Sequence, residues 1–325
     1  QIYNSILEVR RTGKLLIDSL LSKKQHRIYI DLKHSGYITR QYVYDYLDSI
    51  ARNTGDIIPP ICSHCAATGM EEEYYSPFVD EYALVKSKEV KKTKLYPFSI
   101  NLYDEEIERI CRLNGIIGLT LEQRILGGYL DPETEFKGIF GIRSRAKNPP
   151  KEKRLDKTAT MRQFAQFQTF LPDFMTPSDH YKNCLEYPMK QYVTTLHDSI
   201  SSISERQLKF QLYKDYNSLK PFLNNFFYML DKTTEKNDKR DGWKYFCVGS
   251  DMDGLIDPID IAPTVAQYPY IQDRLVQFIP TFLMETNRDP KDYYTPDIKE
   301  EDLREKVSGL FYGNLAKFVI KYFGK

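Results

Sequence analysis

Residues 246–254 read Phe-Cys-Val-Gly-Ser-Asp-Met-Asp-Gly, a short strand-like run that closes on an acidic doublet, Asp251 and Asp253. Two earlier runs of strand character end in a histidine, at His34 and His64. A (β/α)8 barrel carries its chemistry at the C-terminal ends of its strands, where residues far apart in the sequence converge. The trio therefore indicates an α/β fold with a metal-binding hydrolytic site.

Strand and helix patterns alternate in the first third of the chain. We expect strands at 27–34, 57–64 and 115–121, separated by helices at about 39–52 and 104–114. This alternation is typical of α/β proteins. The third strand is apolar throughout, which favours a strand covered on both faces, as in parallel sheets.

A long excursion, 122–243, follows the third strand. Its basic part, 143–157, reads as a solvated loop rather than as a phosphate-binding lid, and its second half is helical and aromatic, as expected of core. A fourth strand at 245–251 and helices near 270–285 and 300–323 complete the chain.

Composition excludes several classes of function. The 325 residues are 41% hydrophobic and 28% charged with a net charge of +1, so no global field draws the chain to nucleic acid or to an anionic membrane. No apolar stretch approaches the roughly 18 residues of a membrane span. Five cysteines make an odd and sparse set, which argues against a disulfide framework and leans toward a reducing compartment such as the cytoplasm.

The cluster Cys62-Ser63-His64-Cys65 has zinc-like spacing, but no second Cys/His pair follows at the distance of a zinc finger. Small buried cysteines at a strand end are the preferred interpretation.

Strand alternation predicts that the terminal groups of the runs point to one face, in the sets Ile30, Leu32 and His34; Cys62 and His64; and Cys247, Gly249 and Asp251. Imidazoles and carboxylates suit zinc or a similar divalent ion, which acidifies a water for attack on a carbonyl. An aspartate beside that water can take its proton and pass it to a leaving amine. Histidines at strand ends can also be merely hydrogen-bonded.

The stretches 30–35, 60–64 and 248–254 resemble, in order and spacing, the membrane-dipeptidase family of the amidohydrolase superfamily. The resemblance extends to further short motifs, Thr12-Gly13, 101–104, 115–118 and 313–315. The resemblance covers nearly the whole chain except residues 143–240. It depends on the order of the motifs and not on any single one of them.

The resemblance implies a role for each member of the trio. His34 and His64 would be histidine ligands of one metal of a binuclear zinc pair, and Asp251 would be the proton-shuttling carboxylate. Asp253 and Gly254 would shape the turn behind it, and a turn carboxylate is at least as good a reading of Asp253 as a catalytic one.

The resemblance also implies a C-terminal half of a (β/α)8 barrel, since the four strands correspond to the last four of the family's eight. The chain then divides into a barrel half at 1–121, a mostly helical insertion at 122–243 and the last strand with its helices at 244–325. The family's paired histidine or His-x-Asp motif and its bridging glutamate have no counterpart here. An N-terminal half removed from this chain, a complementary chain or a degenerate relative would each explain this.

The family's substrate-reading arginine falls on Ile100, and Arg124 is the candidate that could replace it. The resemblance implies a small peptide or amide substrate. Two functions remain open: a zinc-dependent, dipeptidase-like hydrolase that needs the missing half, or a non-catalytic barrel in which the excursion contacts a partner as a binding or assembly module.

Overall fold

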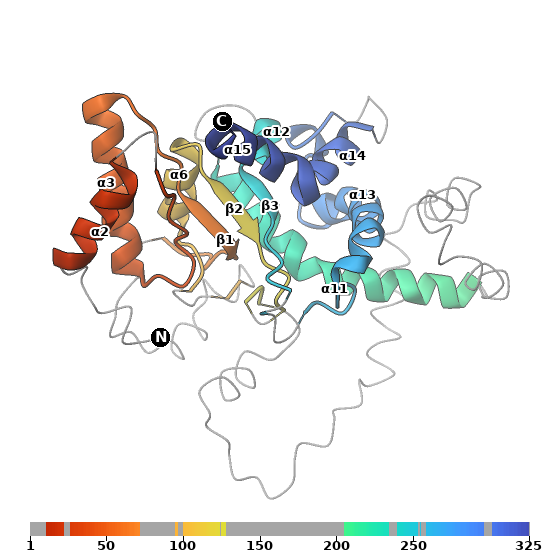
Figure 1. The fold of residues 1–325 in the computed structure, drawn as a ribbon. Coiled ribbons are helices and arrows are strands. Elements are labelled where there is room, and N and C mark those ends of the chain that lie inside the picture. Colours follow the sequence, from red (N-terminus) through yellow and green to blue (C-terminus); the bar gives the residue numbers. More distant parts are fainter. Residues whose placement is uncertain are drawn as a thin grey trace, which may run out of the picture.

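The computed structural model describes most of the predicted barrel part and the C-terminal third, namely residues 11–22, 27–71, 95–96, 100–123, 125–127, 205–233, 239–252, 254, 258–295 and 301–324. Within these ranges the chain forms a parallel sheet of three strands flanked by helices (Figure 1). The predicted fold class, α/β with a parallel sheet, is confirmed at that level. No helix in these ranges is long and apolar enough to cross a membrane, in line with the sequence.

The sheet has the order β1-β2-β3, with β1 at Ile61–Cys65, β2 at Ile116–Leu119 and β3 at Phe246–Val248. Both pairs are parallel, and every residue of β2 is buried. The continuous apolarity of the third predicted strand is thus explained by its central position in the sheet, covered on both faces.

The first predicted strand, 27–34, is an extended segment that joins the sheet at a single parallel bridge between Asp31 and Ile61. Leu32 N donates to Ile61 O at 2.8 Å, but the N–H of Ser63 is taken by the carboxylate of Asp31 at 3.0 Å. The Asp31 side chain therefore takes the place that a backbone carbonyl would have in a regular sheet. The hydrogen bonding between this segment and β1 ends there.

The second predicted strand begins at Ile61 rather than at 57, because Pro59 and Pro60 have no N–H to donate to a ladder. Its register against β2 shifts between Cys62 and Cys65. Cys62 pairs with Ile117, whereas Cys247 pairs with the next residue of β2, Gly118. The expectation that Cys62 and Cys247 share one face is therefore wrong, since successive strand residues alternate between faces.

The helices of the N-terminal part are α2 (Arg11–Leu21), α3 (Tyr37–Thr54) and α6 (Asp104–Arg112). The predicted helices at 39–52 and 104–114 are confirmed within two residues. Helix α3 ends at Gly55, whose φ of 70° is the left-handed C-cap conformation that glycine adopts without steric cost.

The C-terminal helices are α11 (Glu205–Lys232), α12 (Lys239–Gly242), α13 (Tyr268–Glu285), α14 (Glu301–Ser308) and α15 (Asn314–Phe323). Short helical turns accompany them at η5 (Trp243–Tyr245), η6 (Val265–Gln267), η7 (Pro290–Asp292) and the π-helical η8 (Gly309–Gly313). The predicted helix at 300–323 is therefore a helix with a π-helical segment in its middle.

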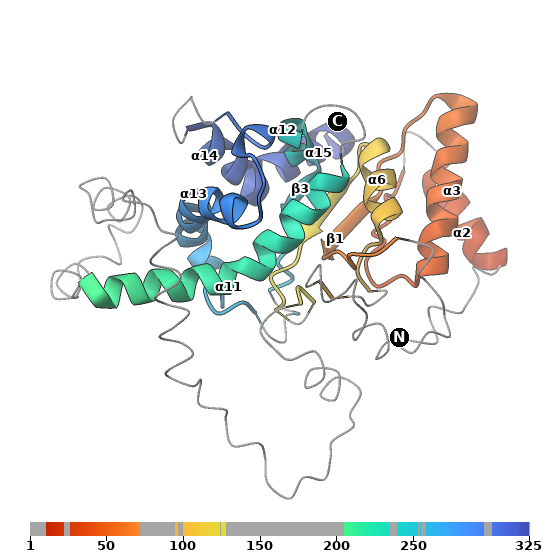
Figure 2. The ribbon, with the colours of Figure 1, turned by 180° about the vertical axis from the view of Figure 1, so that it is seen from behind.

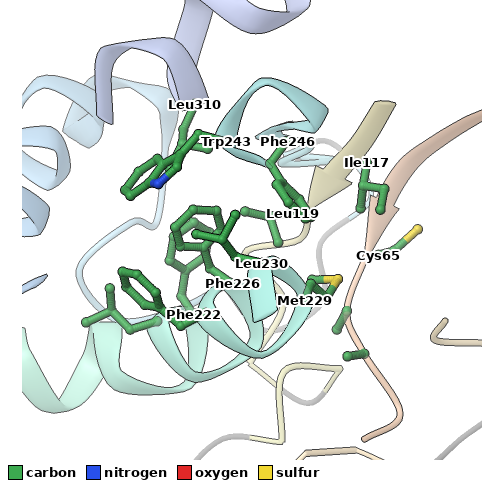
Figure 3. Close-up of a cluster of buried hydrophobic side chains, with 14 of the residues drawn as sticks. Cys65, Ile117, Leu119, Phe222, Phe226, Met229, Leu230, Trp243, Phe246 and Leu310 are labelled. Atoms are coloured by element: carbon green, nitrogen blue, oxygen red, sulfur yellow. The ribbon is translucent and has the colours of Figure 1, made fainter. Parts of the chain in front are cut away.

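Helices α6 and α11 cover one face of the sheet (Figure 2), and α15 packs on the other. The buried aromatic side chains of α11 pack against β2, β3 and Trp243 (Figure 3), as expected for the second half of the excursion. On the face beneath α15, Phe318 packs with Ile116 and Cys247.

The side chain of Asn225 in α11 ties this helix to the loops that follow two strands. Its amide oxygen accepts from Ala67 N at 3.0 Å and its amide nitrogen donates to Leu126 O at 2.8 Å. The long helix is therefore fixed at the edge of the sheet where the strands end.

Candidate functional site

Three side chains from distant parts of the sequence meet at the C-terminal edge of the sheet. The Nε2 atoms of His34 and His64 lie 3.0 Å apart, and Nε2 of His64 lies 3.4 Å from Oδ2 of Asp251. The structure therefore brings together the three residues that the sequence singles out.

His34 reaches this edge through a break in the extended backbone. It has a φ of 64°, and Ser35 N donates to Leu32 O at 3.2 Å, which closes a turn around it. The Asp31 carboxylate accepts from Lys33 N at 3.0 Å as well as from Ser63 N. A positive φ in a residue other than glycine costs free energy, so the neighbouring contacts must hold it in place.

His64 lies in the irregular part of β1, where the register shifts. The Oγ of Ser63 is 2.8 Å from Nδ1 of His64, which orients the ring so that Nε2 faces His34. The carbonyl of Ser63 crosses toward β2 so closely that a Cβ at Gly118 would lie 1.8 Å from its oxygen. Only glycine fits there, because any side chain would overlap the backbone.

Asp251 follows β3 and also has a left-handed backbone, with a φ of 49°. Gly254 N donates to Asp251 O at 2.7 Å, and a Cβ at Gly254 would lie 2.6 Å from the Asp251 carboxylate. A side chain at position 254 would therefore displace the Asp251 carboxylate from its present position. The Asp251 side chain remains 41% exposed to solvent.

The surroundings of His64, burial first, favour its neutral form. Burial lowers its pKa, the Lys33 ammonium lowers it further, and the Asp251 carboxylate opposes both. Lys33 is 7% exposed, its Nζ donates to Ile100 O at 3.4 Å, and burial lowers its own pKa. A neutral imidazole is the form that binds a metal ion or accepts a proton.

A buried ion pair underlies the edge beside His34. Arg40 of α3 is 2% exposed and Glu106 of α6 is 0% exposed, and Arg40 Nε donates to Glu106 Oε1 at 2.6 Å. Burial by itself would lower the pKa of Arg40, but the charge and hydrogen bonds of Glu106 outweigh it and raise that pKa. The guanidinium of Arg40 is therefore charged throughout the pH range in which the protein is folded.

The distances from Nε2 of His64 to Nε2 of His34 and to Oδ2 of Asp251 are close to those between two ligands of one zinc ion. Two tetrahedral zinc ligands at about 2.0–2.1 Å lie about 3.3 Å apart. The spacings of His64 from His34 and from Asp251 are close to that value. Among the residues that the structure describes, however, no group of three or more His, Cys, Asp or Glu side chains is arranged to hold a metal ion. The pair of imidazoles suits an ion, and further ligands are needed to complete its shell.

Some sequence-predicted candidates lie elsewhere. Arg124 and Asp253 fall outside the described residues. Cys62 and Cys65 are free and buried, as the preferred interpretation of their cluster expects. The basic stretch 143–157 also lies outside the described part of the chain.

The sequence analysis missed residues that hold the site in shape. Asp31 and Ser63 act through hydrogen bonds to backbone and ring atoms, and Arg40 and Glu106 act from the helices beneath. Asp31 gave no clear signal, since it alternates with apolar residues in 27–34 as any outward-facing strand residue would. The ion pair joins positions 66 residues apart, and no local pattern connects them.

Comparison with known proteins adds no relative. No protein-family model matches this sequence, and no curated protein or solved structure shows significant similarity. The fold and the site define an α/β protein with a histidine and carboxylate cluster at the C-terminal edge of a parallel sheet.

Proposed function

We propose that this chain contributes half of a metal-dependent hydrolase of amide or peptide bonds, with a dipeptidase-like site on a (β/α)8 barrel scaffold. The observation that carries the proposal is the 3.0 Å contact between His34 and His64, with the Asp251 carboxylate beside it at the strand ends. This edge is where parallel α/β enzymes place their reacting groups. The ordered motifs that resemble membrane dipeptidases support the same activity.

In this proposal His34 and His64 hold a zinc ion through their Nε2 atoms, and the remaining ligands come from residues outside the described part or from another chain. A bound zinc ion would acidify a water and polarise the carbonyl of the scissile bond. Ser63 Oγ fixes the orientation of the His64 ring. Burial and the Lys33 ammonium keep that ring neutral and available as a ligand.

Asp251 is the proposed general base and general acid. Its Oδ2 lies 3.4 Å from His64 and is accessible, so it can accept a proton from the attacking water and return it to the leaving amine. Ile100 stands where the family has its carboxylate-reading arginine. The substrate is therefore proposed as a small peptide or amide, with Arg124 as the candidate for recognising its carboxylate.

Metal content is the decisive measurement. We expect the purified full chain, supplied with zinc and with any partner that co-purifies, to retain bound zinc in elemental analysis. His34→Asn and His64→Gln should each lower the affinity for zinc by at least about tenfold. Asp289→Asn, which changes an exposed carboxylate that caps η7, serves as the control. Absence of bound zinc from the unmutated protein would sink the proposal.

The second candidate is a binding or assembly module on the same scaffold. It is favoured by the incomplete ligand set among the described residues. The two candidates separate clearly, because a module would show no zinc-dependent amide hydrolysis and would bind a partner equally well after His64→Gln.

A further inference from the structure

We infer that the buried pair of Arg40 and Glu106 positions His34 for its contact with His64, so that Arg40 is a positioning residue of the site. The relevance of this role to catalysis rests on the proposed hydrolase function. The geometric role itself rests only on contacts around His34.

The guanidinium of Arg40 joins three segments at once. Its Nη2 donates to Glu106 Oε2 at 2.8 Å, which completes a two-pronged ion pair with the Nε contact. Its Nη1 donates to Ser35 O at 2.9 Å, and Nη2 also donates to Asn101 O at 3.2 Å. Ser35 directly follows His34, so the pair fixes the Ser35–Gly36 peptide unit, one residue beyond that histidine.

The conformation of His34 explains why such a contact is needed. Its φ of 64° is strained for a residue with a side chain, and strained residues persist where their surroundings over-determine them. The Asp31 carboxylate holds Lys33 N on the preceding side, and Arg40 holds Ser35 O on the following side. The backbone on each side of His34 is thus held by a side chain, that of Asp31 before it and that of Arg40 after it.

The chemistry of the contact requires arginine. A guanidinium presents five N–H donors in a rigid fork, whereas a lysine ammonium is a compact point charge. Three nitrogens of Arg40 contact four acceptor atoms at separate positions, an arrangement that the single nitrogen of lysine does not reproduce. Glu106 in turn accepts from Tyr103 N at 3.0 Å, which anchors the fork to the start of α6.

The chain offers a matched control in a second buried ion pair. Arg274 of α13 lies 3.1 Å from Asp215 of α11, and both side chains are buried. Arg274→Lys removes a buried guanidinium whose Nε donates to Asp215 of α11 and whose Nη atoms donate to Gln277 and Tyr270 within α13. A general loss of stability should therefore follow from either arginine, and a change at the histidines only from Arg40.

The test compares metal-free full-length proteins by NMR of the imidazole protons, with the signals assigned through His34→Asn and His64→Gln. The ring centroids of His34 and His64 are 4.9 Å apart, so the unmutated protein should show a cross-relaxation peak between them. We expect this peak to disappear or weaken severalfold in Arg40→Lys and to persist in Arg274→Lys. Zinc affinity should fall at least about tenfold only in Arg40→Lys.

A peak of undiminished intensity in folded Arg40→Lys would overturn the inference, as would its absence from the unmutated protein. If Arg40→Lys does not fold, Glu106→Gln replaces it, since it keeps the side-chain volume and weakens the hold on the fork, and the same expectation applies. Loss of the peak in a protein that binds no zinc supports the positioning role while refuting the hydrolase proposal. The two failures can therefore be told apart.

Discussion

The carbonyl oxygen of Ser63 lies directly against Gly249, where an added Cβ would stand 1.7 Å from that oxygen. Ser63 belongs to β1, and Gly249 follows β3 by one residue. This approach across the central strand brings the end of β3 next to the irregular part of β1. It accounts for the position of Asp251 beside His64.

Gly249→Ala should therefore be severely destabilising. The added methyl group overlaps a backbone atom that cannot rotate away, and overpacking of this kind costs about 2–4 kcal/mol. Gly313→Ala is the matched control, because nothing lies within 4 Å of a Cβ there and the backbone is helical. We expect the control to be neutral or to stabilise by about 0.5–1 kcal/mol in urea unfolding. Similar unfolding free energies for the two variants would contradict this account.

Asp31→Ala should remove a contact that holds the backbone next to His34 and should lower the free energy of unfolding. Two backbone N–H groups, of Lys33 and Ser63, lose their acceptor, at a cost of about 1–2 kcal/mol that is moderated by the exposure of Asp31. Asp31→Asn keeps an oxygen acceptor and should cost clearly less. Urea unfolding of both variants measures the difference, and equal losses would show that the Asp31 oxygen does not matter.

Stability should fall as the solution becomes acidic, in part through His64. Because burial lowers the folded-state pKa of His64 below its ordinary value of 6.5, the unfolded chain takes up a proton first as the pH falls. The stability from the neutral ring is complete above about pH 6.5 and is lost below it. In metal-free protein, His64→Gln should flatten this part of the pH profile of urea midpoints. An unchanged slope in the variant would disprove the assignment.

Asp251→Asn should slow turnover strongly without unfolding the protein. Asparagine tolerates the left-handed backbone at a φ of 49°, so the turn is kept while the proton acceptor is lost. We expect kcat for hydrolysis of a simple dipeptide such as Ala-Ala to fall about 10²–10⁴-fold, with an unchanged circular dichroism spectrum. Asp273→Asn, which affects an ion pair with Arg304, should leave kcat unchanged. Full activity in Asp251→Asn would exclude the proposed proton transfer.

Regular elements of this fold could be predicted from the sequence because their signals are local. The apolar spacing of α3 and the continuous apolar run of β2 identify both elements. The helix at 300–323 was recognised, but its π-helical segment was not, since one additional residue in a turn leaves the apolar pattern nearly unchanged.

The convergence of His34, His64 and Asp251 was predicted, but not the way it is achieved. Strand alternation was expected to align them, whereas two of them have left-handed backbones and the third lies where β1 is irregular. Such departures depend on contacts across the fold, and a single sequence does not encode them in any short pattern. The same holds for the ion pair beneath His34.

The bond from Asn225 to the loops after β1 and β2 has a consequence for how this chain could be divided. Excision of residues 122–243 would remove Asn225, would leave Ala67 N without its acceptor and would strip the aromatic cover from the sheet. Helix α11 and the strands should therefore melt in one cooperative transition, visible through the single tryptophan, Trp243, which packs against Phe226. Helix α11 is therefore a structural part of the same folding unit as the strands and not a segment that could be exchanged between scaffolds.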